Sequence, residues 1–198
     1  VETPANGVLF RYSDGSVVEN ITVFGGETWR DGFMGVMDVG SRIVVQESTF
    51  VGGRDGVYTH LADGIVVRHN RMRDLRFGVH EMYTSDTLVR NNTVRDATIG
   101  VVVMTNPAGN VVVENDVRRA RSGVSLSGID SYVAENVVVN NRRGIATLSS
   151  QSLYERNTVV GNDIGIRSTS LLPTNHVVLN DLVENDRPAL AVIGPLRV

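Results

Sequence analysis

The chain has 198 residues, of which 41% are hydrophobic, and its formal net charge is −3. A general nucleic-acid-binding protein is normally clearly basic, so the charge argues against that class of partner. No apolar run reaches the roughly 20 residues that a membrane-spanning helix needs. The absence of cysteine excludes disulfides, thiolate metal sites and a cysteine nucleophile.

A glycine followed by valine or isoleucine marks a repeat along the chain. An early coil opens at Gly7, and Pro188, Ala189 and Leu190 replace the glycine motif in the last one. Between these ends the motif recurs every 21 to 23 residues, at Gly35, Gly56, Gly78, Gly100, Gly123, Gly144 and Gly165. Repeats of this length are typical of solenoids, in which each repeat packs against its neighbours.

Each coil also contains a short apolar stretch that ends in asparagine about 13 to 15 residues after the glycine. These residues are Asn20, Asn70, Asn92, Asn115, Asn136, Asn157 and Asn180, with Ser48 in the equivalent place once. Short β-branched segments bounded by glycine and asparagine indicate strands, and no segment of ten or more residues has a helical period. We expect glycine and asparagine to turn the corners in left-handed conformations. We also expect asparagines one coil apart to form hydrogen-bonded ladders.

The sequence therefore predicts an all-β protein, a right-handed parallel β-helix (solenoid) of about eight coils with roughly 22 residues each. Residues 1–198 are assigned to a single β-helix domain, which we expect to be a portion of a longer solenoid. An insertion at residues 25–32 interrupts the register and holds the only tryptophan, Trp29. Such insertions form loops on one face, and both a binding loop and a functionless loop fit this one.

One column of equivalent positions contains potential soft metal ligands. Four residues after the repeated glycine, three consecutive coils carry His60, Met82 and Met104, and His80 lies two residues before Met82. Alternate residues of a strand share a face, so His80 and Met82 should project the same way. Thioether and imidazole donors together favour Cu(I) over zinc or magnesium. The alternative is that these side chains only pack in the core or on the surface, as methionine commonly does.

Every basic side chain among the 19 lysine and arginine residues is arginine, and many lie around one corner of successive coils. This strip consists of Arg68, Arg71, Arg73, Arg76, Arg90, Arg95, Arg118, Arg119, Arg121, Arg142 and Arg143. It could bind an acidic polysaccharide or another anion. Asp74, Asp96, Glu114 and Asp116 are interleaved with it, which favours a solvated face of mixed charge.

The segment from Gly78 to Asp86, GVHEMYTSD, resembles the G-V-H-x-M-Y-T-x-D stretch of NosD-type proteins, a β-helical repeat family. The segment from Gly100 to Asn106 resembles the following turn of that family, with Met104 at the same place. The specific agreement covers about residues 76–106, while the rest of the chain is similar as generic coils. NosD-type proteins are maturation factors of nitrous-oxide reductase that take part in supplying its copper centres.

The resemblance implies an extracytoplasmic (periplasmic or cell-surface) accessory protein that binds copper or docks for metal transfer. Implied partners are ABC transporter subunits and a copper chaperone or nitrous-oxide reductase itself, with no nucleic acid and no membrane span in this chain. The residues around the motif, Glu81, Tyr83 and Asp86, are then further binding groups beside the histidine and methionine set.

A polysaccharide-active enzyme on the same fold, a uronate C5-epimerase or a lyase, is the competing interpretation. Such epimerases carry Asp-Pro-His within a G-F-D-P-H-E-like stretch, whereas residues 77–81 here keep the histidine and glutamate but lack Asp-Pro. Proton abstraction next to a uronate carboxylate needs a base and a group that neutralises the carboxylate. His80 would be the base with Arg54 or Arg76, and Tyr58 or Tyr83 the acid. A non-catalytic binding solenoid is the remaining alternative.

Overall fold

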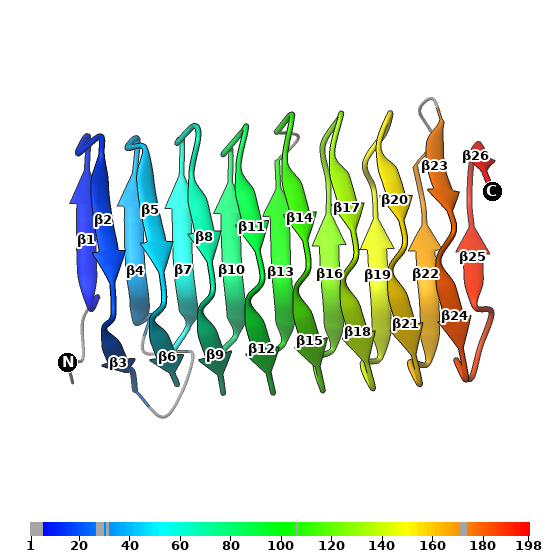
Figure 1. Ribbon diagram of the computed structural model, residues 1–198, viewed down its shortest axis with the longest axis horizontal. Helices are drawn as coiled ribbons and strands as arrows, with labels where there is room; N and C mark the ends of the chain where they lie inside the picture. The colour runs from blue at the N-terminus through cyan, green and yellow to red at the C-terminus, as the bar shows by residue number, and fades with distance from the viewer. Residues whose placement is uncertain (1–5, 27–29, 31, 106, 171–173) are drawn as a thin grey trace.

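The structure, a computed structural model, describes residues 6–26, 30, 32–105, 107–170 and 174–198. Its regular elements are β-strands in three parallel sheets of nine, nine and eight strands. Strands that are one coil apart in sequence lie side by side, so the sheets run the length of the molecule (Figure 1). This confirms the predicted all-β parallel solenoid and its period, while the right-handed winding stays a prediction. No helix in these residues is long and apolar enough to cross a membrane.

The first sheet contains β1 (Val8–Arg11), β4 (Met34–Val39), β7 (Asp55–His60), β10 (Phe77–Met82), β13 (Ile99–Met104), β16 (Ser122–Leu126), β19 (Arg143–Thr147), β22 (Ile164–Ser168) and β25 (Leu190–Val192). The second contains β2 (Ser16–Glu19), β5 (Ile43–Gln46), β8 (Val66–Arg68), β11 (Leu88–Arg90), β14 (Val111–Val113), β17 (Tyr132–Ala134), β20 (Leu153–Glu155), β23 (Asn175–Val178) and β26 (Leu196–Arg197). The third contains β3 (Thr22–Phe24), β6 (Thr49–Val51), β9 (Arg71–Arg73), β12 (Thr93–Arg95), β15 (Asp116–Arg118), β18 (Val137–Val139), β21 (Thr158–Val160) and β24 (Asp181–Val183).

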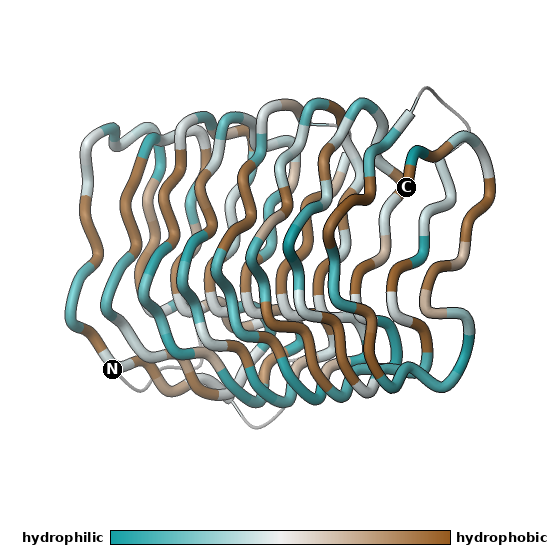
Figure 2. Tube along the Cα trace, turned by 45° about the vertical axis from the view of Figure 1, so that its right-hand side comes forward, coloured by the Kyte–Doolittle hydropathy of each residue, from teal (hydrophilic) through white to brown (hydrophobic). Residues whose placement is uncertain are grey.

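The hydrophobic core is a continuous column of side chains enclosed by the three sheets. Apolar segments recur at the same places in successive coils (Figure 2). The residue after the repeated glycine points into this core, and both Val101 and Val124 are fully buried there. β-Branched side chains suit these positions because they pack well on a pleated strand surface. The column of residues that follow the repeated glycine therefore faces the core.

The repeated glycines lie within strands of the first sheet and not at corners. Gly78, for example, has no positive φ and sits inside β10. A Cβ atom built on Gly78 would lie 2.5 Å from the carbonyl oxygen of Gly100 and 2.9 Å from Cγ1 of Val94. The expected left-handed glycines occur elsewhere, for example at Gly40 and Gly64 with φ values of 68° and 67°, and not at the repeated positions. Close packing of neighbouring coils and sheets selects glycine here.

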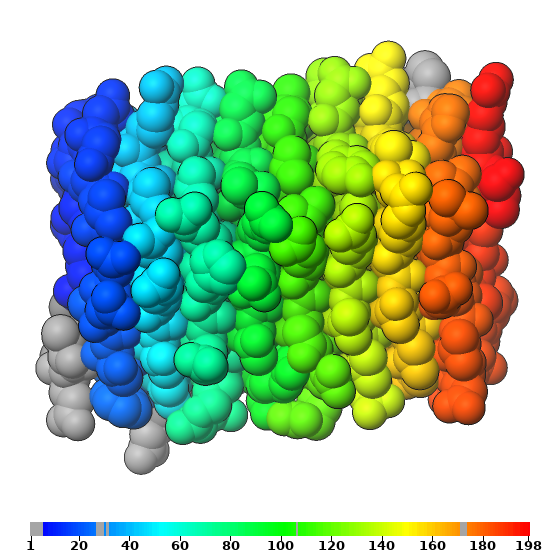
Figure 3. Space-filling model, in the orientation of Figure 1, coloured from blue at the N-terminus to red at the C-terminus, as the bar shows by residue number. Residues whose placement is uncertain are grey.

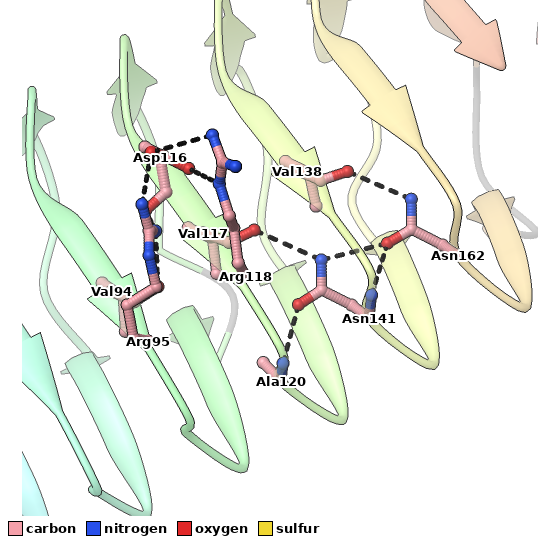
Figure 4. A network of polar contacts seen from close by, with 9 residues as sticks. All are labelled: Val94, Arg95, Asp116, Val117, Arg118, Ala120, Val138, Asn141 and Asn162. Atoms are coloured by element: carbon pink, nitrogen blue, oxygen red, sulfur yellow. Dashed lines mark hydrogen bonds and ion pairs between the residues drawn. The ribbon is translucent and has the colours of Figure 1, made fainter.

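Asparagine ladders run along the solenoid as predicted. The first ladder links Asn70, Asn92, Asn115, Asn136, Asn157 and Asn180, and the second links Asn141, Asn162 and Asn185. In the second ladder, Nδ2 of Asn141 donates to Oδ1 of Asn162 at 3.0 Å (Figure 4). Oδ1 of Asn141 accepts the backbone N–H of Ala120 at 2.8 Å. Each amide thus joins neighbouring coils, which satisfies polar groups that would otherwise be buried without partners.

The left-handed corner residues stand one position before the ladder. His69, Asn91 and Glu114 have φ values of 57°, 52° and 58°. Asn20 also has a positive φ, 54°, and belongs to this corner column. The next residue occupies the ladder position instead, because its backbone N–H donates to Oγ of Ser48. The alignment of Asn20 with the ladder was therefore wrong by one residue.

The stacked coils form successive bands from the N-terminal to the C-terminal end of the described chain (Figure 3). Of the insertion at residues 25–32, Trp29 lies outside the described residues. The start of the insertion is anchored, because the backbone N–H of Gly25 donates to the carbonyl of Val51 at 2.8 Å. Its role as a binding loop stays a prediction.

Candidate functional site

Strand β10 presents His80 and Met82 on the outer face of the first sheet. Side chains alternate along a strand, and Val79 lies in the hydrophobic core, so the fully buried Glu81 also points inward. Val102 is the register partner of His80 on β13. It is buried but is not part of the hydrophobic core cluster, which is expected of a side chain on the outer face. His80 and Met82 therefore share the outer face, as the alternation predicted.

His60, Met82 and Met104 occupy neighbouring register positions on β7, β10 and β13. Adjacent strands are about 4.8 Å apart, so the three side chains form a row across the face. His60 and Met82 are half-buried, and Met104 is 37% exposed. The structure thus brings these three predicted residues together. The three rotatable bonds of methionine allow its sulfur to move within this row.

His80 contacts a buried carboxylate, that of Asp55, which also forms an ion pair with Arg76. Nδ1 of His80 lies 3.0 Å from Oδ2 of Asp55, which is fully buried. Arg76 donates from Nε and Nη2 to the same carboxylate at distances of 3.1 to 3.2 Å. A carboxylate only accepts hydrogen bonds, so in the neutral form of His80 this contact places the ring proton on Nδ1 and a lone pair on Nε2.

This Nε2 atom is buried and has no hydrogen-bond partner among the described residues. The rings of Tyr58 and Phe77 pack edge-on against His80, with centroids 4.9 Å and 4.8 Å from the imidazole. The hydroxyl of Tyr58 donates to Sδ of Met82 at 3.6 Å. Burial raises the pKa of Tyr58, so its hydroxyl keeps the proton that it donates. An unpartnered buried nitrogen is costly, and metal ligation would give it a partner.

The arrangement fits copper by its donor chemistry. Histidines that bind metals commonly donate their second ring N–H to a carboxylate, as His80 does to Asp55. No group of three or more His, Cys, Asp and Glu side chains that could hold a metal occurs in the described part of the chain. A site on this face would therefore depend on the sulfur atoms of Met82 and Met104, which soft Cu(I) accepts and harder ions do not.

The other three predicted binding residues are separated by the structure. Glu81 faces the interior, where the hydroxyl of Thr87 donates to its Oε2 at 2.9 Å, and burial raises the pKa of Glu81 to about 8. Tyr83 and Asp86 lie in the corner that follows β10, and both have positive φ. Tyr83 is 52% exposed, with its ring centroid 5.8 Å from that of His60. Of the three, Tyr83 alone is shown in contact with the His60, Met82 and Met104 row.

The geometry gives the enzyme interpretation little support. Both arginines considered for the uronate carboxylate are held by Asp55: Arg76 donates to it, and Nε of Arg54 lies 3.6 Å from Oδ2. The base would be Nε2 of His80, which is buried. A general base must come within hydrogen-bond reach of the proton that it abstracts.

Asp55 is the residue that sequence reasoning missed. It stands immediately before Gly56, and its register partner one coil later is Phe77. Reading the column before the repeated glycine, together with the columns after it, would have placed a carboxylate one strand away from His80. The position of Asp55 could therefore have been read from the sequence. It was missed because the other residues of its column are unlike aspartate, so no repeated pattern marks it.

Comparison with protein-family profiles identifies the family of this chain. The profile of a family described as periplasmic copper-binding protein (NosD) matches residues 5–193. The chain belongs to the NosD family. This confirms the resemblance carried by the GVHEMYTSD segment of β10 and its corner. A comparison with curated proteins found no match.

Solved structures that resemble this NosD-family chain include the periplasmic alginate epimerase AlgG. That structure superposes with a TM-score of 0.68 and 17% sequence identity, covering 89% of this chain and 50% of AlgG. A double mutant of AlgG gives a TM-score of 0.71 with 17% identity, covering 91% of this chain and 50% of the mutant chain. At this identity the likeness shows a shared fold alone. The chain spans about half the length of these epimerase chains.

Proposed function

We propose that this NosD-family chain binds Cu(I) on the outer face of the first sheet, through His80, Met82 and Met104, with His60 beside them. The observation that carries the proposal is the contact between Asp55 and Nδ1 of His80, which leaves a lone pair on a buried and unpartnered Nε2. Asp55 would orient the imidazole and increase its basicity, as carboxylates do behind metal-binding histidines.

The copper is cargo in this proposal. Thioether ligands bind Cu(I) and place no charge on it, and methionine side chains adapt their position easily. Met104 is accessible enough to receive or release an ion, whereas His80 is almost completely buried. The gradient of exposure from Met104 to His80 therefore suits transient binding and transfer.

The biological setting that we infer is copper-site maturation of nitrous-oxide reductase outside the cytoplasmic membrane. ABC transporter subunits and a copper chaperone, or the reductase itself, would exchange the metal with this chain. The NosD family description and the resemblance of residues 78–86 support this setting. The word periplasmic in the descriptions of both the family and AlgG supports the location.

The experiment is competition for Cu(I) against a chromophoric chelator under reducing conditions. Met82→Leu keeps the volume of the side chain and removes its sulfur, so it separates ligation from packing. We expect it to weaken Cu(I) retention at least roughly tenfold, and His80→Ala to do the same. Met72→Leu is the matched control, since Met72 is buried in the core and cannot reach the face. Equal copper retention in all these proteins would refute the site.

A further inference from the structure

The arginines of the outer surface divide into a paired and an unpaired group. The paired ones, which have an acidic partner within 4.0 Å, include Arg73, Arg90, Arg95, Arg118 and Arg119. Figure 4 shows the case of Asp116, which joins Arg95 and Arg118. Those that form no ion pair with an acid in the described part of the chain include Arg121, Arg142, Arg143 and Arg167. The ion-paired arginines are therefore followed, in the later coils, by arginines without an ion pair, although Asp163 occupies the same column as Arg121 and Arg142 one coil later.

These four arginines are close enough to repel one another. The backbone N–H of Arg143 donates to the carbonyl of Arg121, which places the two on neighbouring coils. Arg167 lies on β22, the strand that pairs with β19 of Arg143. Burial lowers the pKa of Arg143, and the charges of Arg167, Arg142 and Arg121 lower it further. An anion bound between them would relieve this repulsion.

A groove of about 260 Å³ lies on the first sheet between these charges. Its floor is formed by Ser125 and Ala146, which occupy the same outward column as His80 and Val102. Bulky side chains fill this column on β10 and β13, and small ones leave it open on β16 and β19. Arg143 and Arg167 line the groove, together with Thr169.

An exposed apolar side chain also lines the groove, beside Thr147 and Thr169. This side chain is that of Leu148, which is 64% exposed. Ile193, which follows the strand paired with β22, occupies the same column and is 56% exposed, with Thr169 between it and Leu148. Exposed apolar side chains beside charges without an ion pair are typical of a surface that another molecule covers.

We propose that this groove binds an extended acidic segment of a partner protein, with carboxylates on Arg143 and Arg167 and an apolar side chain against Leu148. Guanidinium groups bind carboxylates with favourable planar geometry. A peptide can supply carboxylates and apolar side chains together, since side chains of an extended chain alternate. A uronate polymer supplies carboxylates but has no apolar side chain for Leu148.

This inference is independent of the copper proposal, because no residue of the groove is a proposed ligand. Both places nevertheless lie on the outer face of the first sheet. Ser125 and Ala146 are two and three strands from His80, which corresponds to about 10 to 14 Å. A partner segment seated in the groove would therefore extend beside the histidine and methionine row.

The test is binding of a fluorescent peptide of alternating glutamate and leucine to the metal-free protein, followed by anisotropy. We expect saturable, salt-sensitive binding that the double variant Arg143→Gln, Arg167→Gln weakens about tenfold or more. The matched control, Arg90→Gln with Arg119→Gln, removes the same charge from paired positions and should leave binding within about twofold. Absence of saturable binding, or an equal loss in both double variants, would overturn the proposal.

Two further measurements use other probes. Leu148→Ser should weaken the glutamate–leucine peptide and leave a glutamate–serine peptide unaffected, because only the former places an apolar side chain there. Saturable binding of a lysine–leucine peptide by the unaltered protein would overturn the proposal without any variant. Tighter binding of an oligouronate than of an acidic peptide with the same number of carboxylates would do so as well, and would identify a polysaccharide surface instead.

Discussion

Replacing Glu81 by glutamine should remove a large part of the pH dependence of stability. Glu81 is fully buried, its Oε1 has no partner among the described residues, and a single hydrogen bond from Thr87 reaches Oε2. Burial therefore raises the pKa of this carboxyl from 4.5 to about 8. The folded state holds the proton at pH values at which the unfolded chain has released it.

The direction of this pKa change decides how the stability contributed by Glu81 varies with pH. The full contribution of Glu81 is present below pH 4.5, and it is lost progressively as the pH rises toward the folded-state pKa of about 8. The difference between the two pKa values corresponds to as much as about 5 kcal/mol of unfolding free energy. Asp38, also buried and with a raised pKa, contributes in the same direction. The difference between wild type and Glu81→Gln therefore isolates Glu81.

Urea denaturation followed by far-UV circular dichroism, between about pH 5 and pH 8, measures the effect. We expect wild-type stability to fall steeply with rising pH, and the Glu81→Gln curve to fall much less, so that the variant is the more stable protein near pH 8. Glu184→Gln, at an exposed corner, is the control and should follow the wild type. Parallel curves for wild type and Glu81→Gln would show that Glu81 is ionised in the fold, and would refute the inward, desolvated placement.

Further outcomes follow from the fold and the site. Asn136→Ala should lower the free energy of unfolding by about 3 kcal/mol or more, measured by urea denaturation, because it leaves buried donors and acceptors of both neighbouring coils unpaired. Val124→Arg should unfold the adjacent coils, whereas Ser125→Arg on the outward side of the same strand should be tolerated, as thermal denaturation will show. Asp55→Asn should lower Cu(I) affinity about 10- to 100-fold in the chelator competition, because the imidazole loses its orienting carboxylate. Incubation with polymannuronate should produce neither epimerised nor unsaturated uronate by NMR.

The fold was predictable because its two strongest constraints recur in most coils. Close approach of the coils demands glycine at positions such as Gly78, and the ladders demand asparagine at positions such as Asn115. Their physical roles were harder to predict. A glycine that turns a corner and a glycine that allows close packing of a neighbouring coil recur with the same spacing along the sequence. The corner itself tolerates many residue types, including Glu114 and His69, and so has no sequence signature.

The candidate site was predictable only where it follows the repeat. The row of His60, Met82 and Met104 shares one column, and column reading places its members together. Asp55 and His80 are 25 residues apart in the sequence and belong to two different columns, so the repeat does not predict their contact. The inward facing of Glu81 was obscured because its column is polar in several coils, and a polar residue in a core column looks like a surface residue.

The asparagine ladders also bear on how such a chain changes over generations. Within a ladder each amide is paired with the amide of the next coil, so an insertion or deletion of one whole coil of 21 to 23 codons keeps these amides paired. Duplication of such a unit lengthens the molecule and leaves the interior unchanged. The outward columns are then free to diverge, which allows His80 on β10 and Arg167 on β22 to descend from one ancestral position. Unrelated binding surfaces can in this way arise side by side on one scaffold.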